Sequence, residues 1–216
     1  MTRIVAGSVG GRALQVPRAG TRPTSERVRE ALFSRLEHLD VIADARVLDL
    51  FAGSGALGIE AASRGAAAVT LVEAARQAAD VCRRNVVTLG LAGRVVVAAE
   101  KAERFVGRTP LAPWDLVLVD PPYDLPEPDL STVLAGLDGA LAPGAVVVVE
   151  RSSRAPEPVW PAGVRRFDTR AYGETVVWFA EPTGPTGPTG PDEPQGPQEP
   201  EGETGTDGPP TVAPGA

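Results

Sequence analysis

The hydrophobic residues of this chain gather in short, nearly continuous runs rather than at alternating positions. Runs of this length that are rich in Val and Leu are typical of strands buried on both faces, which predicts a parallel sheet. Stretches with helical character separate the runs, and this alternation favours a doubly wound α/β architecture. We expect strands at Arg46–Phe51, Ala68–Glu73, Arg94–Ala99, Asp115–Asp120 and Ala145–Glu150, and helices near Gly55–Arg64, Ala74–Leu89 and Pro128–Leu141.

The pattern changes near both ends of this alternating region. Val164–Arg170 and Glu174–Ala180 flank Tyr172-Gly173, which predicts an antiparallel hairpin that closes one edge and brings the sheet to seven strands. The first 20 residues are short apolar stretches broken by glycines, and they predict a small second hairpin. After it, Thr24 or Ser25 can cap a helix that continues to about Leu39.

The last part of the chain has a different composition. Residues 181–216 hold ten of the 22 prolines, eight of the 24 glycines, seven acids and no Lys or Arg. Such a segment buries too little apolar surface to offset its chain entropy, so we expect a disordered acidic tail. The predicted organisation is an N-terminal hairpin and helix over residues 1–40, an α/β domain over 41–180 and the tail over 181–216.

The tail also accounts for the net charge of −7, because residues 1–180 hold 21 basic and 21 acidic side chains. Within that neutral part, residues 1–35 carry seven arginines and two acids. This surplus indicates a segment that faces phosphates, although a solvated arginine-rich face would show the same pattern. The single cysteine, Cys82, excludes a disulfide framework and a Cys-based metal site. The amino terminus has no apolar leader, so we expect a soluble, cytoplasmic protein. We also expect that the protein holds no metal.

A glycine-rich turn follows the first predicted strand of the sheet. The segment reads Asp49-Leu50-Phe51-Ala52-Gly53-Ser54-Gly55-Ala56-Leu57-Gly58. Its glycines permit a tight turn and a close approach of a ligand, and the helix that follows offers unpaired backbone N–H groups. Glu73 ends the second strand, where its two carboxyl oxygens can bind both hydroxyls of a ribose. The pattern predicts a cofactor that contains a nucleoside.

Two cofactors compete for this turn. A dinucleotide such as NAD would place its pyrophosphate beside the anionic Asp49, which is electrostatically unfavourable. The cationic sulfonium and free amino group of S-adenosylmethionine would be attracted to the same carboxylate. We therefore favour S-adenosylmethionine, with these candidate residues around it: Asp49, Phe51, Ala52, Gly53, Ser54, Gly55 and Glu73.

A rigid corner follows the fourth predicted strand. Asp120-Pro121-Pro122-Tyr123 comes directly after the apolar run 116–119, and its two prolines end the strand. The carboxylate of Asp120 and the carbonyl of Pro121 can accept the two hydrogens of an exocyclic amine, while the Tyr123 ring stacks on a flat base. We interpret the corner as a catalytic site for a planar amino group, with Asp120, Pro121, Pro122 and Tyr123 as its residues.

Taken together, the motifs resemble those of the bacterial small-subunit ribosomal RNA guanine-N2 methyltransferases of the RsmD type. The resemblance runs from Arg3 to about Ala180. The glycine turn and the corner occur in many methyltransferases, whereas the block at 22–33 is much more specific to this family. The segments that carry the likeness are Arg3-Ile4-Val5-Ala6-Gly7, Gly11-Arg12-Ala13-Leu14, Arg22-Pro23-Thr24-Ser25-Glu26-Arg27-Val28-Arg29-Glu30-Ala31-Leu32-Phe33, Leu48–Gly58 and Asp120–Tyr123.

The resemblance implies a Rossmann-like class I methyltransferase fold with an N-terminal extension that grips RNA. It also implies methyl transfer from S-adenosylmethionine to N2 of a guanine, guanine 966 in the family, in 16S rRNA of an assembling 30S particle. We expect the enzyme to act as a monomer. The residues expected to contact the RNA are Arg3, Arg12, Arg22, Thr24, Arg27 and Arg29.

One position departs from the family pattern. Related enzymes present Asp or Asn near the adenine amine after the third strand, where this chain has Lys101. Because lysine accepts no hydrogen bond, either the neighbouring Glu100 or a backbone group must make that contact, and we assign it to Glu100. Three other functions stay open from the residues: a DNA or other RNA base-amino methyltransferase, an NAD-linked oxidoreductase, and a catalytically silent RNA-binding assembly factor.

Overall fold

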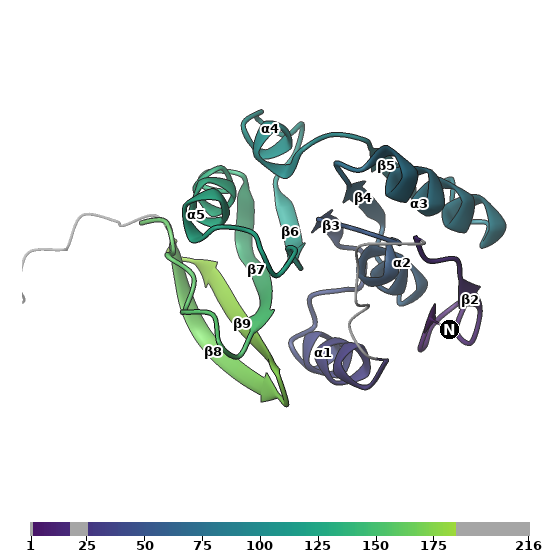
Figure 1. Ribbon diagram of the computed structural model, residues 1–216, viewed down its shortest axis with the longest axis horizontal. Helices are drawn as coiled ribbons and strands as arrows, with labels where there is room; N and C mark the ends of the chain where they lie inside the picture. Colours follow the sequence, from purple (N-terminus) through teal and green to yellow (C-terminus); the bar gives the residue numbers. More distant parts are fainter. Residues whose placement is uncertain (1, 18–25, 185–216) are drawn as a thin grey trace, which may run out of the picture. The chain divides into compact units, whose positions relative to one another are not determined.

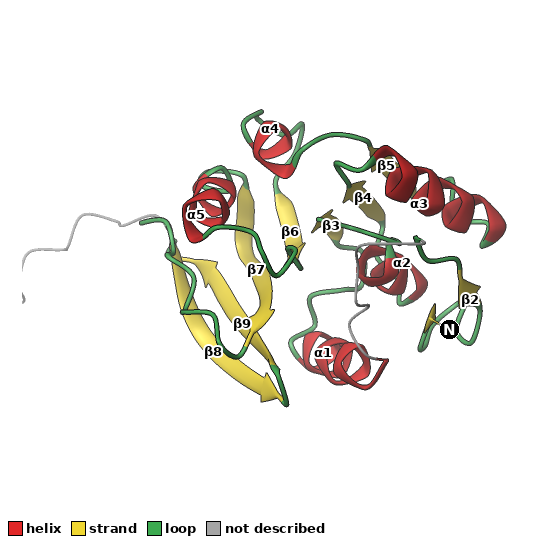
Figure 2. Cartoon of the chain, viewed as in Figure 1, coloured by secondary structure: helices red, strands yellow, loops and turns green. Residues whose placement is uncertain are grey.

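A seven-stranded sheet forms the centre of the fold (Figure 2). The computed structural model describes residues 2–17 and 26–184 of the chain. The strand order is β5-β4-β3-β6-β7-β9-β8. The five strands from β5 to β7 are parallel, and β9 runs antiparallel to both β7 and β8. The strands are β3 (Arg46–Leu50), β4 (Ala68–Val72), β5 (Val95–Ala98), β6 (Trp114–Val119), β7 (Leu141–Ser152), β8 (Val164–Tyr172) and β9 (Thr175–Pro182).

Helices cover both faces of this sheet (Figure 1). One buried cluster joins α1, α2 and α3 to the sheet, and a second joins α4 and α5 to the opposite face. Consecutive residues of one strand enter opposite clusters, as Val147 and Val148 of β7 do. This burial on both faces explains the unbroken apolar runs in the sequence. The helices are α1 (Glu26–His38), α2 (Ala56–Ser63), α3 (Arg76–Thr88), α4 (Ala102–Val106) and α5 (Glu127–Ala135).

The order of the strands places a topological switch point between β3 and β6. From β3 the chain builds outward through β4 and β5, and then returns to add β6 and β7 on the other side. Leu50 pairs with Val119 at the carboxyl ends of β3 and β6. Ligands of open α/β sheets bind at this kind of position. The predicted fold class is confirmed, and the glycine turn and the Asp-Pro-Pro-Tyr corner emerge from these two neighbouring strands.

The boundaries of several elements differ from the sequence-based expectation. The pattern missed the short helix α4, and it started β7 at Ala145, although the strand begins at Leu141. At the end of the domain, β9 runs through Pro182, and Glu181 forms an ion pair with Arg165 at 2.8 Å. The predicted start of the tail at residue 181 is therefore too early. The strand can include Pro182 because a proline is tolerated at the end of a strand. Residues 185–216, where we expected disorder, lie outside the described part.

The N-terminal segment belongs to the same compact unit as the sheet, which spans Met1–Gly184. Strands β1 (Thr2–Arg3) and β2 (Ala13–Leu14) form the expected antiparallel hairpin. Buried Ile4 and Leu14 join the larger cluster together with Phe33 of α1. The predicted N-terminal extension therefore shares its core with the sheet. Over the described ranges, no helix is both long and apolar enough to span a bilayer.

Candidate active site

The glycine turn between β3 and α2 has an unusual backbone. Phe51, Gly53 and Gly55 all have positive φ angles, of 63°, 58° and 81°. Only glycine adopts this conformation without strain, so the strained Phe51 shows that the surrounding structure holds the turn in place. Gly58 serves a different purpose, because a Cβ there would lie 2.3 Å from a Leu71 methyl group. Its absence lets α2 pack directly against β4.

Asp49 lies beneath this turn with its side chain almost completely buried. Its Oδ2 accepts a hydrogen bond of 2.8 Å from the backbone N–H of Gly58. Burial raises the pKa of Asp49 to about 8, against the lowering effect of the Gly58 N–H, and the charges of Asp120 and Glu73 raise it further. The three carboxylates therefore lie close enough to repel one another. A cation bound among them would relieve that repulsion.

Glu73 links the end of β4 to the same turn. Its Oε2 accepts a 2.8 Å hydrogen bond from the N–H of Gly53, and its Oε1 accepts one of 2.7 Å from the N–H of Ala75. The buried Cys82 thiol donates to the carbonyl of Gly53 at 3.2 Å, and burial raises the pKa of this thiol to about 12. Protein groups alone thus fix the turn. Each Glu73 oxygen retains a second acceptor position for a ribose hydroxyl.

The corner after β6 stands next to this turn, as the strand order requires. Asp120 is partly buried and lies on the same sheet face as Asp49, because Asp49 pairs with Leu118, two residues before Asp120. Pro121 is buried, whereas the Tyr123 side chain is 65% exposed. The arrangement places a hydrogen-bond acceptor and an accessible ring beside the carboxylates of the turn.

Glu100, expected to contact an adenine, is engaged by two arginines. Its carboxylate accepts a hydrogen bond from Arg108, and Arg104 Nε lies 3.8 Å away. The bond from Arg108 lowers the pKa of Glu100. The adenine contact stays a prediction, and it requires an acceptor position of Glu100 that Arg108 does not use.

The residues expected to contact RNA fall into three groups. Arg3, Arg12 and Arg27 are exposed, with Arg3 paired to Glu26 at 3.1 Å and Arg12 donating to the carbonyl of Thr88 at 3.2 Å. Arg29 is fully buried, so the expectation that it contacts RNA is wrong. The sequence could not separate Arg29 from its neighbours, since burial depends on packing. Arg22 and Thr24 lie outside the described residues.

Arg29 belongs to a buried ionic cluster that attaches the N-terminal hairpin to α2. Glu60 is the centre of this cluster and is fully buried. Its carboxylate accepts the backbone N–H groups of Val5 at 2.7 Å and Ala6 at 3.0 Å, and it lies 3.7 Å from Arg29 Nε. Arg64 Nε donates to Glu60 from one helical turn away at 2.8 Å. Because α2 begins at the glycine turn, this cluster connects the hairpin to the helix of that turn.

Sequence reasoning also missed Asn85 of α3, which is buried. Its Nδ2 donates to the carbonyl of Ser54 at 2.9 Å and to that of Gln15 at 3.0 Å, while its Oδ1 accepts the N–H of Gln15 at 2.9 Å. One side chain therefore ties the glycine turn to the segment that follows β2. An Asn on a helix face gives no local signal for such a role.

Two further charged residues at the edge were missed. Glu150 and Arg151 end the apolar run of β7 and line a narrow cavity with Asp120, Pro121 and Tyr123. The signal is present in the sequence, since a charged residue that directly follows a buried strand is the same signal that points to Asp120.

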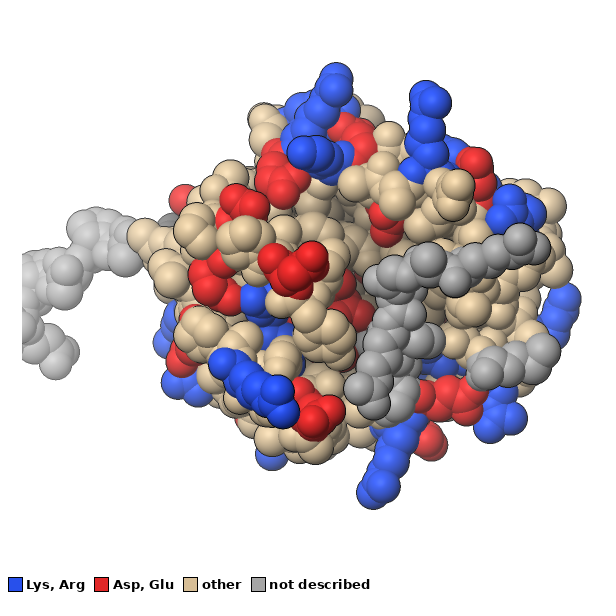
Figure 3. Space-filling model, in the orientation of Figure 1, with Lys and Arg blue, Asp and Glu red and all other residues tan. Residues whose placement is uncertain are grey.

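Charges of both signs occur on the face shown in Figure 3. Lys and Arg side chains project from its margins, and Asp and Glu side chains lie among them rather than on a separate surface. The arginine surplus of the N-terminal segment therefore does not extend to a uniformly basic face in this view. On this face, contact with phosphates would depend on individual arginines.

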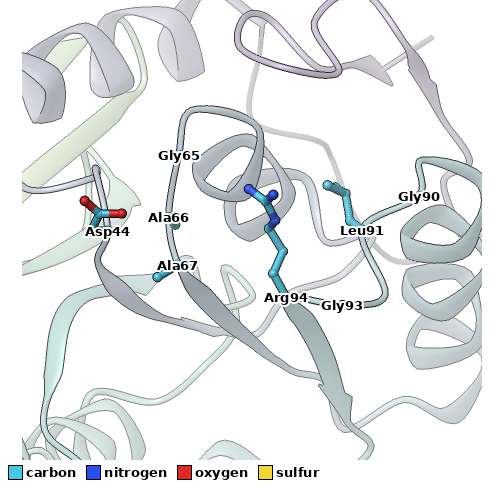
Figure 4. Close-up of a pocket in the computed structure, with 8 residues that line it drawn as sticks. All are labelled: Asp44, Gly65, Ala66, Ala67, Gly90, Leu91, Gly93 and Arg94. Atoms are coloured by element: carbon cyan, nitrogen blue, oxygen red, sulfur yellow. The ribbon is translucent and has the colours of Figure 1, made fainter.

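A larger cavity, of about 500 Å³, lies at the opposite edge of the sheet. Figure 4 shows its residues on the loops that precede β3, β4 and β5, with Asp44 and Arg94 among them. These are the amino ends of the parallel strands, so the cavity is remote from the glycine turn and the corner. Within the described ranges, no three or more His, Cys, Asp or Glu side chains are grouped to hold a metal ion.

Comparison with known proteins places this site in a family. The model of the family described as "conserved hypothetical protein 95" matches residues 2–181. "Ribosomal RNA small subunit methyltransferase D" of Escherichia coli (strain K12) is 42% identical over 161 residues, which are 74% of this chain and 79% of that protein. The chain belongs to this methyltransferase family. The resemblance drawn from the sequence motifs is thereby confirmed.

Two further members support the assignment over more of the family's length. "Putative rRNA methyltransferase YlbH" of Bacillus subtilis (strain 168) is 34% identical over 183 residues, covering 81% of this chain and 96% of that protein. The solved structure titled "Putative methyltransferase yhhF from Escherichia coli" superposes with a TM-score of 0.74 at 36% identity, covering 83% of this chain and 97% of the other. The family match therefore spans the residues of the hairpin, the sheet and both site motifs.

Proposed function

We propose that this protein transfers a methyl group from S-adenosylmethionine to the exocyclic N2 of a guanine in 16S rRNA. We take the substrate to be an assembling 30S particle, the target to be guanine 966, and the enzyme to act as a monomer. One observation carries the proposal: Asp120 of an Asp-Pro-Pro-Tyr corner lies beside the acids of a glycine turn and shares their electrostatic environment. The names of the relatives, which include rRNA methyltransferases, support the class of substrate.

The residues of the turn fit S-adenosylmethionine. When bound, this cofactor supplies a methyl group on a cationic sulfur. Asp49 and Glu73 provide negative charge for the cation and acceptors for hydroxyl groups, and the positive φ angles of Gly53 and Gly55 leave no Cβ in the path of a ligand. Burial and the neighbouring acids raise the pKa of Asp49, and an adjacent positive charge would return this carboxyl to its ionised form.

The corner would activate the guanine amine. The N2 lone pair is delocalised into the ring, and nitrogen becomes nucleophilic when its two hydrogens are held out of the plane. The Asp120 carboxylate and the Pro121 carbonyl would accept one hydrogen each and direct the lone pair at the methyl carbon. The bound cofactor would supply the methyl carbon that this lone pair attacks, and its sulfur would keep the electron pair of the bond that breaks. Positioning of this kind supplies most of the rate.

Two other contributions come from the same corner. Positive charge develops on N2 as the methyl group arrives, and the adjacent Asp120 carboxylate stabilises it. The extra proton then leaves N2 for Asp120 or for solvent. The exposed Tyr123 ring would stack on the base, a contact worth about 1–3 kcal/mol. The target guanine must be unpaired or turned out of its helix to reach these groups.

A direct experiment uses the full-length protein with labelled S-adenosylmethionine and two substrates, 16S rRNA alone and 30S particles, both from cells that lack this modification. The RNA is digested and its nucleosides are identified by mass spectrometry. We expect one labelled product, N2-methylguanosine, at one position. Label on another base or another atom of guanine would reject the proposal, as would no label with a folded protein that binds the cofactor in calorimetry.

A further inference from the structure

A narrow cavity adjoins the catalytic corner. Asp120, Pro121 and Tyr123 line one side of it, and Glu150 and Arg151 at the carboxyl end of β7 line the other. Its volume is about 20 Å³, so the cavity admits the edge of a flat ligand rather than a whole base. With Tyr123 exposed at the same place, a base stacked on that ring would point one edge into this cavity.

The strand register fixes the position of Glu150 relative to Asp120. Val119 of β6 pairs with Val149 of β7, and both strands run in the same direction. Asp120 and Glu150 follow this pair by one residue each, so they leave the sheet on the same face with backbones about 4.8 Å apart. Glu150 is 7% exposed. Its carboxylate can accept several hydrogen bonds at once, so a donor from a ligand can join a partner within the protein.

Arg151 is the next residue of β7, so its side chain leaves the sheet on the face opposite to Glu150, where it contacts the corner loop. Its side chain is 5% exposed, and its Nη2 contacts Glu127 and donates to the carbonyl of Leu125 at 3.3 Å. Its Nε and Nη1 are buried and have no hydrogen-bond partner within the described part of the chain. These two nitrogens have almost no accessible surface, so a ligand in the cavity does not reach them. Arg151 therefore attaches the corner loop to the end of β7.

We propose that this cavity reads the Watson–Crick edge of guanine, with Glu150 accepting the N1–H. The inference rests on the proposed function, which places N2 of the guanine at Asp120. Guanine presents its amine and then its N1–H along this edge, and Asp120 and Glu150 offer one acceptor after the other. Glu150 is thus the residue that determines specificity.

The same arrangement rejects the other bases that carry an amine. With N6 of adenine or N4 of cytosine at the corner, the neighbouring ring nitrogen is an acceptor and would face the Glu150 carboxylate. Two acceptors without a hydrogen between them repel, and the base would also lose a favourable bond. A site built to hydrogen-bond a substrate group discriminates strongly against an analogue that lacks it.

The test compares guanine with 2-aminopurine at the target position of the RNA. 2-Aminopurine keeps the amine and the ring shape but has no O6, and its N1 is an acceptor. We expect the wild-type enzyme to methylate guanine about 10²-fold or more faster in single turnover. In Glu150→Gln the side-chain amide can donate to N1, so transfer to guanine should fall and transfer to 2-aminopurine should rise. Equal rates for both bases in the wild type would overturn the inference without any variant.

A purely structural role for Glu150 predicts an equal loss on both substrates, and that result would overturn the inference. Glu181→Gln is the matched control, because it makes the same chemical change on β9, where Glu181 pairs with Arg165. Melting curves and cofactor calorimetry establish that each variant is folded.

The two levels of proposal fail in different ways. If the wild-type enzyme places no methyl group on N2 of guanine, the proposed function itself is wrong. If it does so and Glu150→Gln leaves the ratio of the two rates unchanged, the function stands and the reading of the edge is rejected.

Discussion

The two halves of the sheet edge that carries the site differ in how far their polar groups are satisfied. In the half formed by β3 and β4, the carboxylates of Asp49 and Glu73 and the carbonyls of Gly53 and Ser54 already have hydrogen-bond partners within the protein. In the half formed by β6 and β7, the Tyr123 ring is exposed, and two donors of Arg151 have no hydrogen-bond partner among the described residues.

This difference indicates that the cofactor half is built in advance and that the base half is completed by the substrate. A preorganised turn binds a ligand without the entropic cost of ordering, which suits a small cofactor present at every turnover. An exposed ring beside two carboxylates suits a base that must be distinguished from its competitors, because a wrong base presents an acceptor where a donor is needed. The predictions below test whether the halves are separable.

The largest expected effect comes from Asp120→Ala. Loss of the carboxylate that positions the amine and stabilises its charge should slow methyl transfer by about 10²–10⁴-fold in single turnover. Cofactor affinity in calorimetry should change little, because the glycine turn has its own partners. Asp124→Ala, an exposed change in the same loop, is the control. An active Asp120→Ala enzyme would refute the catalytic role, and a variant that no longer binds the cofactor would show that the halves are not independent.

Asp49→Asn tests whether the raised pKa of Asp49 in the cofactor half makes stability depend on pH. The pKa of Asp49 in the folded protein, about 8, lies above that of an exposed aspartate, so the folded state holds the proton more tightly than the unfolded chain. This carboxyl therefore favours folding at low pH, and the contribution is lost as the pH rises from about 4 to about 8. Denaturant unfolding should show Asp49→Asn gaining stability relative to the wild type across that window, by a few kcal/mol in total.

Outside the window the difference between the two proteins should stay constant, because Asp49 then has the same charge in the folded and unfolded states. A stability difference that does not vary with pH would show that Asp49 has no raised pKa. The same variant should bind S-adenosylmethionine more weakly, since it lacks the negative charge.

Asn85→Ala asks whether the N-terminal hairpin and the cofactor half act together. The change removes three hydrogen bonds at a buried site and should lower the free energy of unfolding by about 1–3 kcal/mol. It should also weaken cofactor binding in calorimetry, because Ser54 loses its tether. Val87→Ala, an exposed change on the same helix, should alter neither quantity appreciably. Unchanged cofactor affinity in a destabilised Asn85→Ala protein would limit Asn85 to a structural role.

The smallest effect is expected from the exposed arginines. Arg12→Gln and Arg27→Gln should each weaken RNA binding several-fold and reduce the slope of log affinity against log salt by about 0.7–0.9 for each phosphate that the arginine neutralises. Filter binding at several salt concentrations measures both quantities. Arg94→Gln is the matched control, because Arg94 lies at the opposite edge of the sheet (Figure 4). If all three variants gave the same slope, RNA would not contact the N-terminal segment through these arginines.

Much of the fold could be read from local patterns. Continuous apolar runs such as 116–119 predicted buried parallel strands, and the glycines after Asp49 predicted a tight turn that opens a helix. Both are local signals, because strand burial and left-handed backbone conformations restrict which residues can stand at a position. The short helix α4 was missed, since a segment of about one turn has no clear period.

For the functional residues of the sheet edge, the sequence determines the identities, and the tertiary structure determines which residues lie together. The identities of Asp49, Glu73, Asp120 and Tyr123, and their places at the ends of strands, follow from the order of residues along the chain. Their proximity follows from the strand order, which sets β3 beside β6 although β4 and β5 come between them in the sequence.

Packing alone buried Arg29 against Glu60, raised the pKa of Asp49, and brought Glu150 and Arg151 to the catalytic corner. These outcomes depend on contacts between residues distant in sequence. Burial in a folded core changes the charge and the hydrogen-bonding needs of a side chain in ways that its neighbours in the chain do not encode.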